Sequence, residues 1–192
     1  MEALLVSTGV VALAEIGDKT QLLAILLAAR FRAPLPIILG IFAATAVNHG
    51  LAALVGNAAG DFLTPDVLRL ILAVSFLAMA AWMLLPDRLD EGPKMFGRLG
   101  AFGATAISFF LIEMGDKTQL ATVALAAHYH SVVLVAAGTT LGMMVADVPA
   151  VYLGEIVTRK IPLAWVRAAA AIVFLLLALL ALMDYFRRFI YA

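Results

Sequence analysis

The sequence predicts an all-α integral membrane protein with six transmembrane helices, arranged as two inverted three-helix repeats. Three observations support this. Of 192 residues, 65% are hydrophobic and the mean hydropathy is +1.06, whereas apolar residues make up about half of a soluble domain. Several apolar stretches are long enough to cross the roughly 30 Å of a bilayer core. An eight-residue motif also recurs 98 positions later.

The predicted spans follow one another along the whole chain. Each is expected to be a helix, because lipid offers no partner to unpaired backbone groups. No Lys or Arg precedes Lys19, so we expect the first stretch to be a helix of the mature protein and not a signal peptide. The six spans are 3–29, 34–56, 67–86, 99–127, 131–153 and 163–183.

The 98-residue offset extends beyond the motif, since Gly40 maps onto Gly138 and Arg69 onto Arg167. We therefore divide one compact membrane domain into a first repeat (1–86), a polar linker (87–98) and a second repeat (99–192). Three crossings per repeat bring the second copy into the membrane from the opposite side, which predicts a pseudo-two-fold axis in the membrane plane.

Basic residues near the helix ends predict the orientation, because cytoplasmic loops carry an excess of Lys and Arg. One side has only Arg69, Arg187 and Arg188. This places both termini outside the cytoplasm. The basic residues of the other side are Arg30, Arg32, Arg88, Lys94, Arg98, Arg159, Lys160 and Arg167.

The repeated motif concentrates charge in apolar sequence, where each ionised side chain costs about 2.5–3.5 kcal/mol at the bilayer centre. On a straight helix, Glu15, Asp18 and Lys19 would share one face. If the two copies meet, four carboxylates and two ammonium groups surround one point. The copies are Glu15-Ile16-Gly17-Asp18-Lys19-Thr20-Gln21-Leu22 and Glu113-Met114-Gly115-Asp116-Lys117-Thr118-Gln119-Leu120.

Such a group of oxygens favours a hard divalent cation, namely calcium, manganese or magnesium, and the absence of cysteine excludes thiolate sites. Four negative and two positive groups leave a formal charge of −2, which one divalent cation neutralises. Magnesium loses its water reluctantly, so the other two ions suit a carrier better. Crowded carboxylates should take up a proton when the cation leaves, which predicts proton-for-metal exchange without any resident cofactor.

The expected ligands are Glu15, Asp18, Glu113 and Asp116. Gly17 and Gly115 would permit close helix approach or a local break of the helix. The threonines and glutamines of the motif point away from the acids on a straight helix, so they could contribute only where the helix unwinds. Supporting or coupling roles are therefore assigned to Lys19, Lys117, Thr20, Gln21, Thr118, Gln119, Asn48 and Asp147, with His49 aligned to Asp147.

Other interpretations stay open. The charges could form structural Glu–Lys ion pairs between helices, or the protein could export another small cationic solute such as a basic amino acid. A passive divalent-cation channel is also possible. Enzyme motifs and a basic patch for nucleic acid are absent from the sequence, so we expect neither an enzyme nor a nucleic-acid partner. The partners expected are a divalent cation, protons and membrane lipids, and the sequence leaves monomer and homodimer open.

The pattern Glu-x-Gly-Asp-Lys-Thr, present once in each half, resembles the signature of the Gdt-type divalent cation transporter family. That family includes bacterial manganese exporters and Golgi calcium/manganese–proton exchangers. The resemblance covers nearly the whole chain. It implies binding of the cation by the acidic residues of both motifs and export of Mn²⁺, with Ca²⁺ possible, in exchange for protons or another coupling ion. It also implies a multi-pass protein of a prokaryotic inner membrane.

Overall fold

The computed structural model describes residues 1–85, 99–160 and 163–191, and within these ranges the side chains of all but 153–160, 163–167 and 188–191. Every regular element in these ranges is an α-helix, which confirms the all-α prediction for them. The predicted linker 87–98 lies outside the described residues. The helices are α1 (Glu2–Glu15), α2 (Lys19–Phe31), α3 (Pro34–Gly60), α4 (Pro65–Met83), α5 (Gly100–Glu113), α6 (Lys117–Tyr129), α7 (Val132–Lys160) and α8 (Leu163–Tyr191).

Within the described residues, four helical stretches are long and apolar enough to cross a membrane. They are Pro34–Gly60, Pro65–Met83, Val132–Tyr152 and Ala168–Arg187. The orientation prediction depends largely on Arg88, Lys94, Arg98, Arg159, Lys160 and Arg167, which lie outside the described residues or side chains. The orientation therefore stays a prediction.

Each of the predicted spans 3–29 and 99–127 is interrupted inside the motif, so of the two roles expected of Gly17 and Gly115 the structure shows the local break. Gly17 and Gly115 have φ angles of 80° and 83°, in the left-handed region that glycine adopts without a Cβ clash. Asp18 and Asp116 then take an extended conformation, with ψ angles of 169° and 170°. Each break therefore ends one half-length helix and starts the next.

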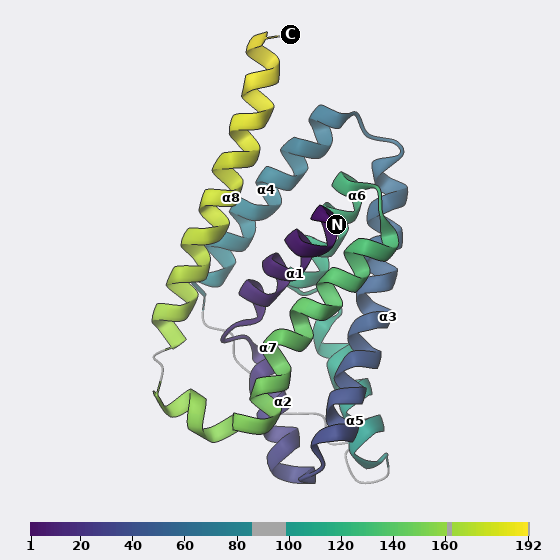
Figure 1. Ribbon diagram of the computed structural model, residues 1–192, viewed down its shortest axis with the longest axis vertical. Helices are drawn as coiled ribbons and strands as arrows, with labels where there is room; N and C mark the ends of the chain where they lie inside the picture. Colours follow the sequence, from purple (N-terminus) through teal and green to yellow (C-terminus); the bar gives the residue numbers. More distant parts are fainter. Residues whose placement is uncertain (86–98, 161–162, 192) are drawn as a thin grey trace.

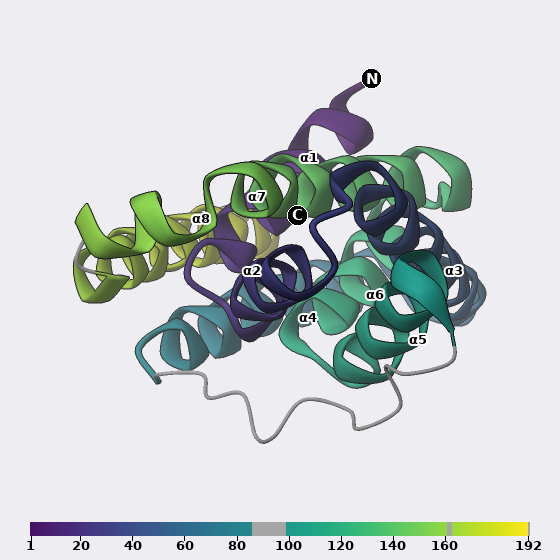
Figure 2. The same ribbon diagram turned by 90° about the horizontal axis from the view of Figure 1, so that it is seen from below.

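Helices from the two halves interleave. α1 packs against α7, and α3 packs against α5 and α6, while α4 and α8 lie side by side (Figure 1). In the same view α1 and α2 run downward and α5 and α6 run upward, so the broken segments of the two halves run in opposite directions. Figure 2 shows α3, α5 and α6 gathered at one end of the molecule and α8 at the other.

Glycines allow α3 to approach α5 closely and α7 to approach α1 closely, at equivalent positions of the two halves. A Cβ at Gly40 of α3 would lie 2.8 Å from the carbonyl oxygen of Phe102 on α5. A Cβ at Gly138 of α7 would lie 2.6 Å from the carbonyl oxygen of Leu4 on α1. Gly138 lies 98 residues after Gly40, and Phe102 lies 98 residues after Leu4. The two halves therefore meet through the same crossing, used twice.

Candidate metal centre

The two helix breaks bring four carboxylates together. Glu15 and Glu113 are the last residues of α1 and α5, and Asp18 and Asp116 precede the first residues of α2 and α6. One oxygen from each of the four lies within 4.8 Å of the others, and all four residues are buried. This spacing fits carboxylates arranged around a single cation.

The lysines of the motif bind the aspartates of the opposite half. Lys19 Nζ lies 2.8 Å from Asp116 Oδ1, and Lys117 Nζ lies 2.6 Å from Asp18 Oδ1. Neither aspartate side chain caps its own helix. These two ion pairs join lysine to aspartate across the two halves, whereas the alternative interpretation expected pairs between lysine and glutamate.

The glutamates are held by threonines. Thr20 Oγ1 donates a hydrogen bond to Glu15 Oε2 at 2.5 Å, and Thr118 Oγ1 donates one to Glu113 Oε2 at 2.8 Å. These threonines could not reach the glutamates on a straight helix, so the break of the helix makes the contact possible. Each hydroxyl occupies one carboxylate oxygen and thereby fixes the direction of the other.

The glutamines stabilise the breaks themselves. The Gly17 N–H donates to Gln21 Oε1 at 2.8 Å, and the Gly115 N–H donates to Gln119 Oε1 at 2.7 Å. Backbone amides that leave a helix inside an apolar protein need such an acceptor. Gln21 Nε2 also donates to the carbonyl oxygen of Ala146 at 3.0 Å, which ties the first break to α7.

Several carboxylate oxygens remain available. Glu15 Oε1, Glu113 Oε1 and Asp116 Oδ2 are buried and have no hydrogen-bond partner among the described residues. Buried charges require a counter-charge or a metal ion. The four carboxylates and two lysines sum to −2, so the lysines balance only half of the negative charge. The arrangement can accept one divalent cation with oxygen ligands.

Asn48 and Asp147, the two further residues predicted to support the site, differ in their contacts. Asn48 Nδ2 donates to the carbonyl oxygen of Phe110 at 3.0 Å, which joins α3 to α5. Asp147 is fully buried on α7 within electrostatic range of Asp18, Glu15 and Glu113. It is not one of the four residues whose ligand atoms converge.

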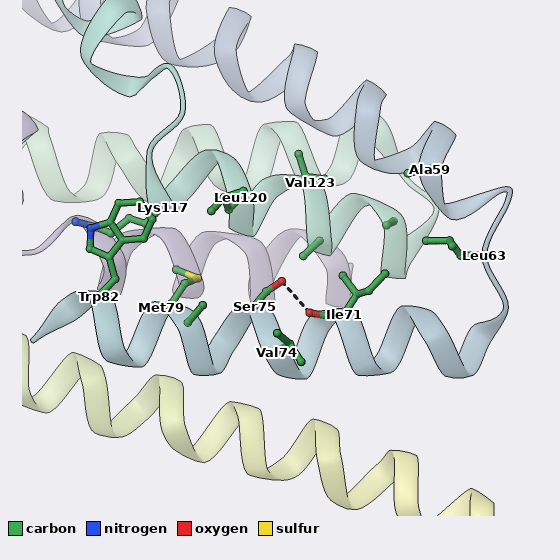
Figure 3. A pocket seen from close by; sticks show the side chains of 13 residues that line it. Ala59, Leu63, Ile71, Val74, Ser75, Met79, Trp82, Lys117, Leu120 and Val123 are labelled. Carbon is green, nitrogen blue, oxygen red and sulfur yellow. Dashed lines mark hydrogen bonds between the residues drawn. The ribbon is translucent and has the colours of Figure 1, made fainter.

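An apolar cavity of about 300 Å³ adjoins one of the two lysines. Figure 3 shows Lys117 beside Trp82 at one end of it and Leu63 with Ala59 at the other. The lining comes from α3, α4, α6 and, at Leu63, the turn between α3 and α4. This cavity could not be predicted from the sequence, because most of its walls are ordinary apolar positions brought together by helix packing.

Comparison with known proteins assigns the chain to a family. The family described as "Divalent cation/proton antiporter GDT1" matches residues 3–91 and 101–188. The chain belongs to this family. The resemblance noted from the motif is thereby confirmed, and transport of a divalent cation is the activity of the GDT1 group.

Curated relatives agree with this assignment. The chain is 52% identical over 180 residues to a Vibrio cholerae protein named "Putative manganese exporter", covering 93% of this chain and 90% of the relative. It is 30% identical to GDT1-like protein 3 of rice, covering 91% and 71% of the two chains. GDT1-like protein 3 of Arabidopsis thaliana is 28% identical over 91% of this chain and 68% of its own. No solved structure matches the chain.

Proposed function

We propose that this GDT1-family protein exports Mn²⁺ in exchange for protons, with Glu15, Asp18, Glu113 and Asp116 as the cation ligands. The observation that carries the proposal is the convergence of these four buried carboxylates, two from each half, within 4.8 Å. The name of the Vibrio cholerae relative supports Mn²⁺ as the cargo. Ca²⁺ uses similar oxygen ligands and is the competing ion.

The two lysines compensate part of the negative charge of the site when the cation is absent. In the present arrangement each ammonium group neutralises one aspartate of the opposite half. A divalent cation that enters competes with the lysines for these carboxylates. Release of the cation returns the aspartates to the lysines and leaves the remaining negative charge for protons. Exchange follows, because a site with net charge −2 is not left uncompensated inside a membrane.

The membrane arrangement completes the proposal. Each broken pair, α1 with α2 and α5 with α6, supplies one crossing, and α3, α4, α7 and α8 supply the other four. The opposite directions of the broken pairs and the equivalent crossings at Gly40 and Gly138 support two inverted repeats. Alternating access then arises by movement of one repeat against the other around a site near the midplane. We place the protein in the inner membrane, with both termini outside the cytoplasm.

A liposome experiment tests the function. Purified protein is reconstituted with a pH dye inside, and Mn²⁺, Ca²⁺, Mg²⁺ or Na⁺ is added outside. We expect Mn²⁺ to drive proton movement in the opposite direction. Asp18→Asn and Asp116→Asn should each reduce the exchange at least about tenfold, equivalent to about 1.4 kcal/mol. Asp66→Asn is the matched control, because Asp66 is exposed and pairs with Arg69 far from the motifs.

Three outcomes would overturn the proposal. Full exchange in both motif variants would remove the carboxylates from the mechanism. Mn²⁺ flux that continues without counter-movement of protons would favour a passive channel. Uptake of lysine in preference to every metal ion would favour a carrier of basic amino acids.

A further inference from the structure

Among the side chains that the structure describes, Asp147 is the one buried acid near the metal centre that the proposed function leaves unused. It lies on α7 with no measurable exposure, and neither carboxylate oxygen has a hydrogen-bond partner among the described residues. The charge that acts on it most is that of Asp18, and Asp147 in turn acts on Glu15 and Glu113. Its electrostatic neighbourhood is therefore negative.

A purely structural role does not account for this carboxylate. Buried structural acids are held by donors or by a basic partner, because an isolated charge in an apolar interior is strongly unfavourable. Asp147 has neither among the described residues. A cation that visits the residue would supply the missing counter-charge.

The surrounding segment of α7 is tied to the metal centre. The carbonyl oxygen of Ala146, the preceding residue, accepts the hydrogen bond from Gln21. Pro149 has no N–H, so the carbonyl of Val145 loses its helical donor four residues later. Asp147 thus lies in a stretch with weakened helical bonding that is attached to the first helix break.

The equivalent residue in the other half is different. His49 aligns with Asp147 at the 98-residue offset and is equally buried, on α3. Its imidazole lies near the backbone of Thr139, and no carboxylate of the metal centre acts on it. Equivalent residues of two opposed repeats lie on opposite sides of the pseudo-symmetry axis. Among the described side chains, only the second half therefore adds a further buried carboxylate beside the metal centre.

We propose that Asp147 is a fifth cation ligand. It binds the divalent cation as the ion enters or leaves the four-carboxylate site through one face of the membrane. This inference rests on the proposed function and adds a direction to it. From one face of the membrane the cation meets Asp147 before it reaches Glu15 and Glu113. From the other face it meets no equivalent acid.

The test separates the two faces of the membrane. The chain has no cysteine. Phe62 lies in the turn after α3 and is 89% exposed. Labelling of Phe62→Cys with an impermeant thiol reagent therefore reports the orientation of the protein in liposomes. In this background, Asp147→Asn should raise the half-saturating Mn²⁺ concentration about tenfold on one face. It should change the value less than about twofold on the other face.

Two further variants keep the test decisive. His49→Gln changes the equivalent buried position and should leave both half-saturating concentrations within about twofold. Asp147→Glu retains the charge and should restore most of the one-sided loss. If Asp147→Asn does not fold, Asp147→Ser carries the test, because it also removes the carboxylate and should shift the value on the same face only.

Defined results would overturn the inference. An equal shift on both faces, no shift on either face, or the same one-sided shift in His49→Gln would each show that the carboxylate is not a one-sided ligand. These results differ from failure of the proposed function, in which the unsubstituted protein itself would not exchange Mn²⁺.

Discussion

The two lysine–aspartate pairs are made from equivalent residues, yet they differ in their access to water. The Lys19 side chain is 23% exposed, whereas the Lys117 side chain is only 2% exposed. Lys117 also borders the cavity between α4 and α6, whose lining is almost entirely apolar and whose Ser75 hydroxyl already donates to the carbonyl oxygen of Ile71 (Figure 3). Lys19 can leave Asp116 for water, while Lys117 has no such destination.

In the proposed mechanism, the difference in exposure of the two lysine side chains determines which half of the site opens first. Under the proposed function, a cation that competes for the carboxylates should displace the partly exposed Lys19 more easily than the enclosed Lys117. We therefore expect Asp116 to be released to the cation before Asp18. The chemical symmetry of the motifs does not make the two halves equal, because the surrounding helices pack differently. α6 packs chiefly against α3, and α2, its counterpart, packs chiefly against α7, the counterpart of α3. α6 also packs against α4, whereas α2 has no comparable packing against α8 in the part of the chain that the structure describes.

The largest effect is expected from removal of the enclosed lysine. Lys117→Met leaves Asp18 buried without its ammonium partner, so the free energy of unfolding should fall by about 3–5 kcal/mol. Lys19→Met should cost about half as much, since Asp116 lies beside a more exposed position. Thermal unfolding in detergent measures both. Saturating Mn²⁺ should restore most of the loss, and equal losses in both variants would contradict the comparison.

The crossing glycines should show where the halves are alike. Gly40→Ala and Gly138→Ala each place a Cβ against a carbonyl oxygen of the facing helix, so each should destabilise the protein by about 1–3 kcal/mol. Gly50→Ala is the control, because a Cβ there meets nothing within 4 Å. Unfolding measurements on the three variants test this. A large difference between Gly40→Ala and Gly138→Ala would break the equivalence of the halves.

Threonine substitutions should have similar effects in the two motifs. Thr20→Val and Thr118→Val remove the hydroxyl donors to Glu15 and Glu113, so each should lower the free energy of unfolding without metal by about 1.5 kcal/mol. Thr→Ser at either position keeps the donor and should recover most of the loss. An unchanged melting temperature in both valine variants would show that the hydroxyls do not hold the glutamates.

The smallest effect is expected at the exposed helix break. Gly115→Ala forces a residue with a Cβ to keep a φ near +83°, and nothing lies within 4 Å of the added atom. The free energy of unfolding should therefore fall only by the backbone strain of this φ angle, about 1 kcal/mol. Gly17→Ala should cost more, because Gly17 is buried. Parallel unfolding experiments rank the two, and a reversed order would contradict this reasoning.

Much of the site followed from the sequence, because a repeated acidic motif in apolar sequence leaves few places where its charges can lie. The sequence thus identified the four residues that the fold brings together. The helix breaks did not follow, since one glycine inside an apolar stretch is compatible with both a straight and a broken helix. Gln21, four residues after Gly17, was the available signal: its side chain can accept the N–H that a break exposes.

The pairing of each lysine with an aspartate of the opposite half could not be predicted from the spacing of residues within the motif. Glu15 and Lys19 are four residues apart, which favours a local pair on a straight helix. The break separates them, and packing of the two halves then brings Lys19 to Asp116. Likewise, alignment paired His49 with Asp147, but which of them faces the carboxylates depends on packing between α3 and α7.

The paired breaks also direct four helix ends at one place. α1 and α5 end there with carbonyl groups that carry partial negative charge, and α2 and α6 begin there with N–H groups that carry partial positive charge, each roughly half an elementary charge. Because these backbone dipoles oppose one another, they nearly cancel at the centre. The field is then set by the side chains, and under the proposed function a change of their partners would let the protein bind its ion firmly in one conformation and release it in another.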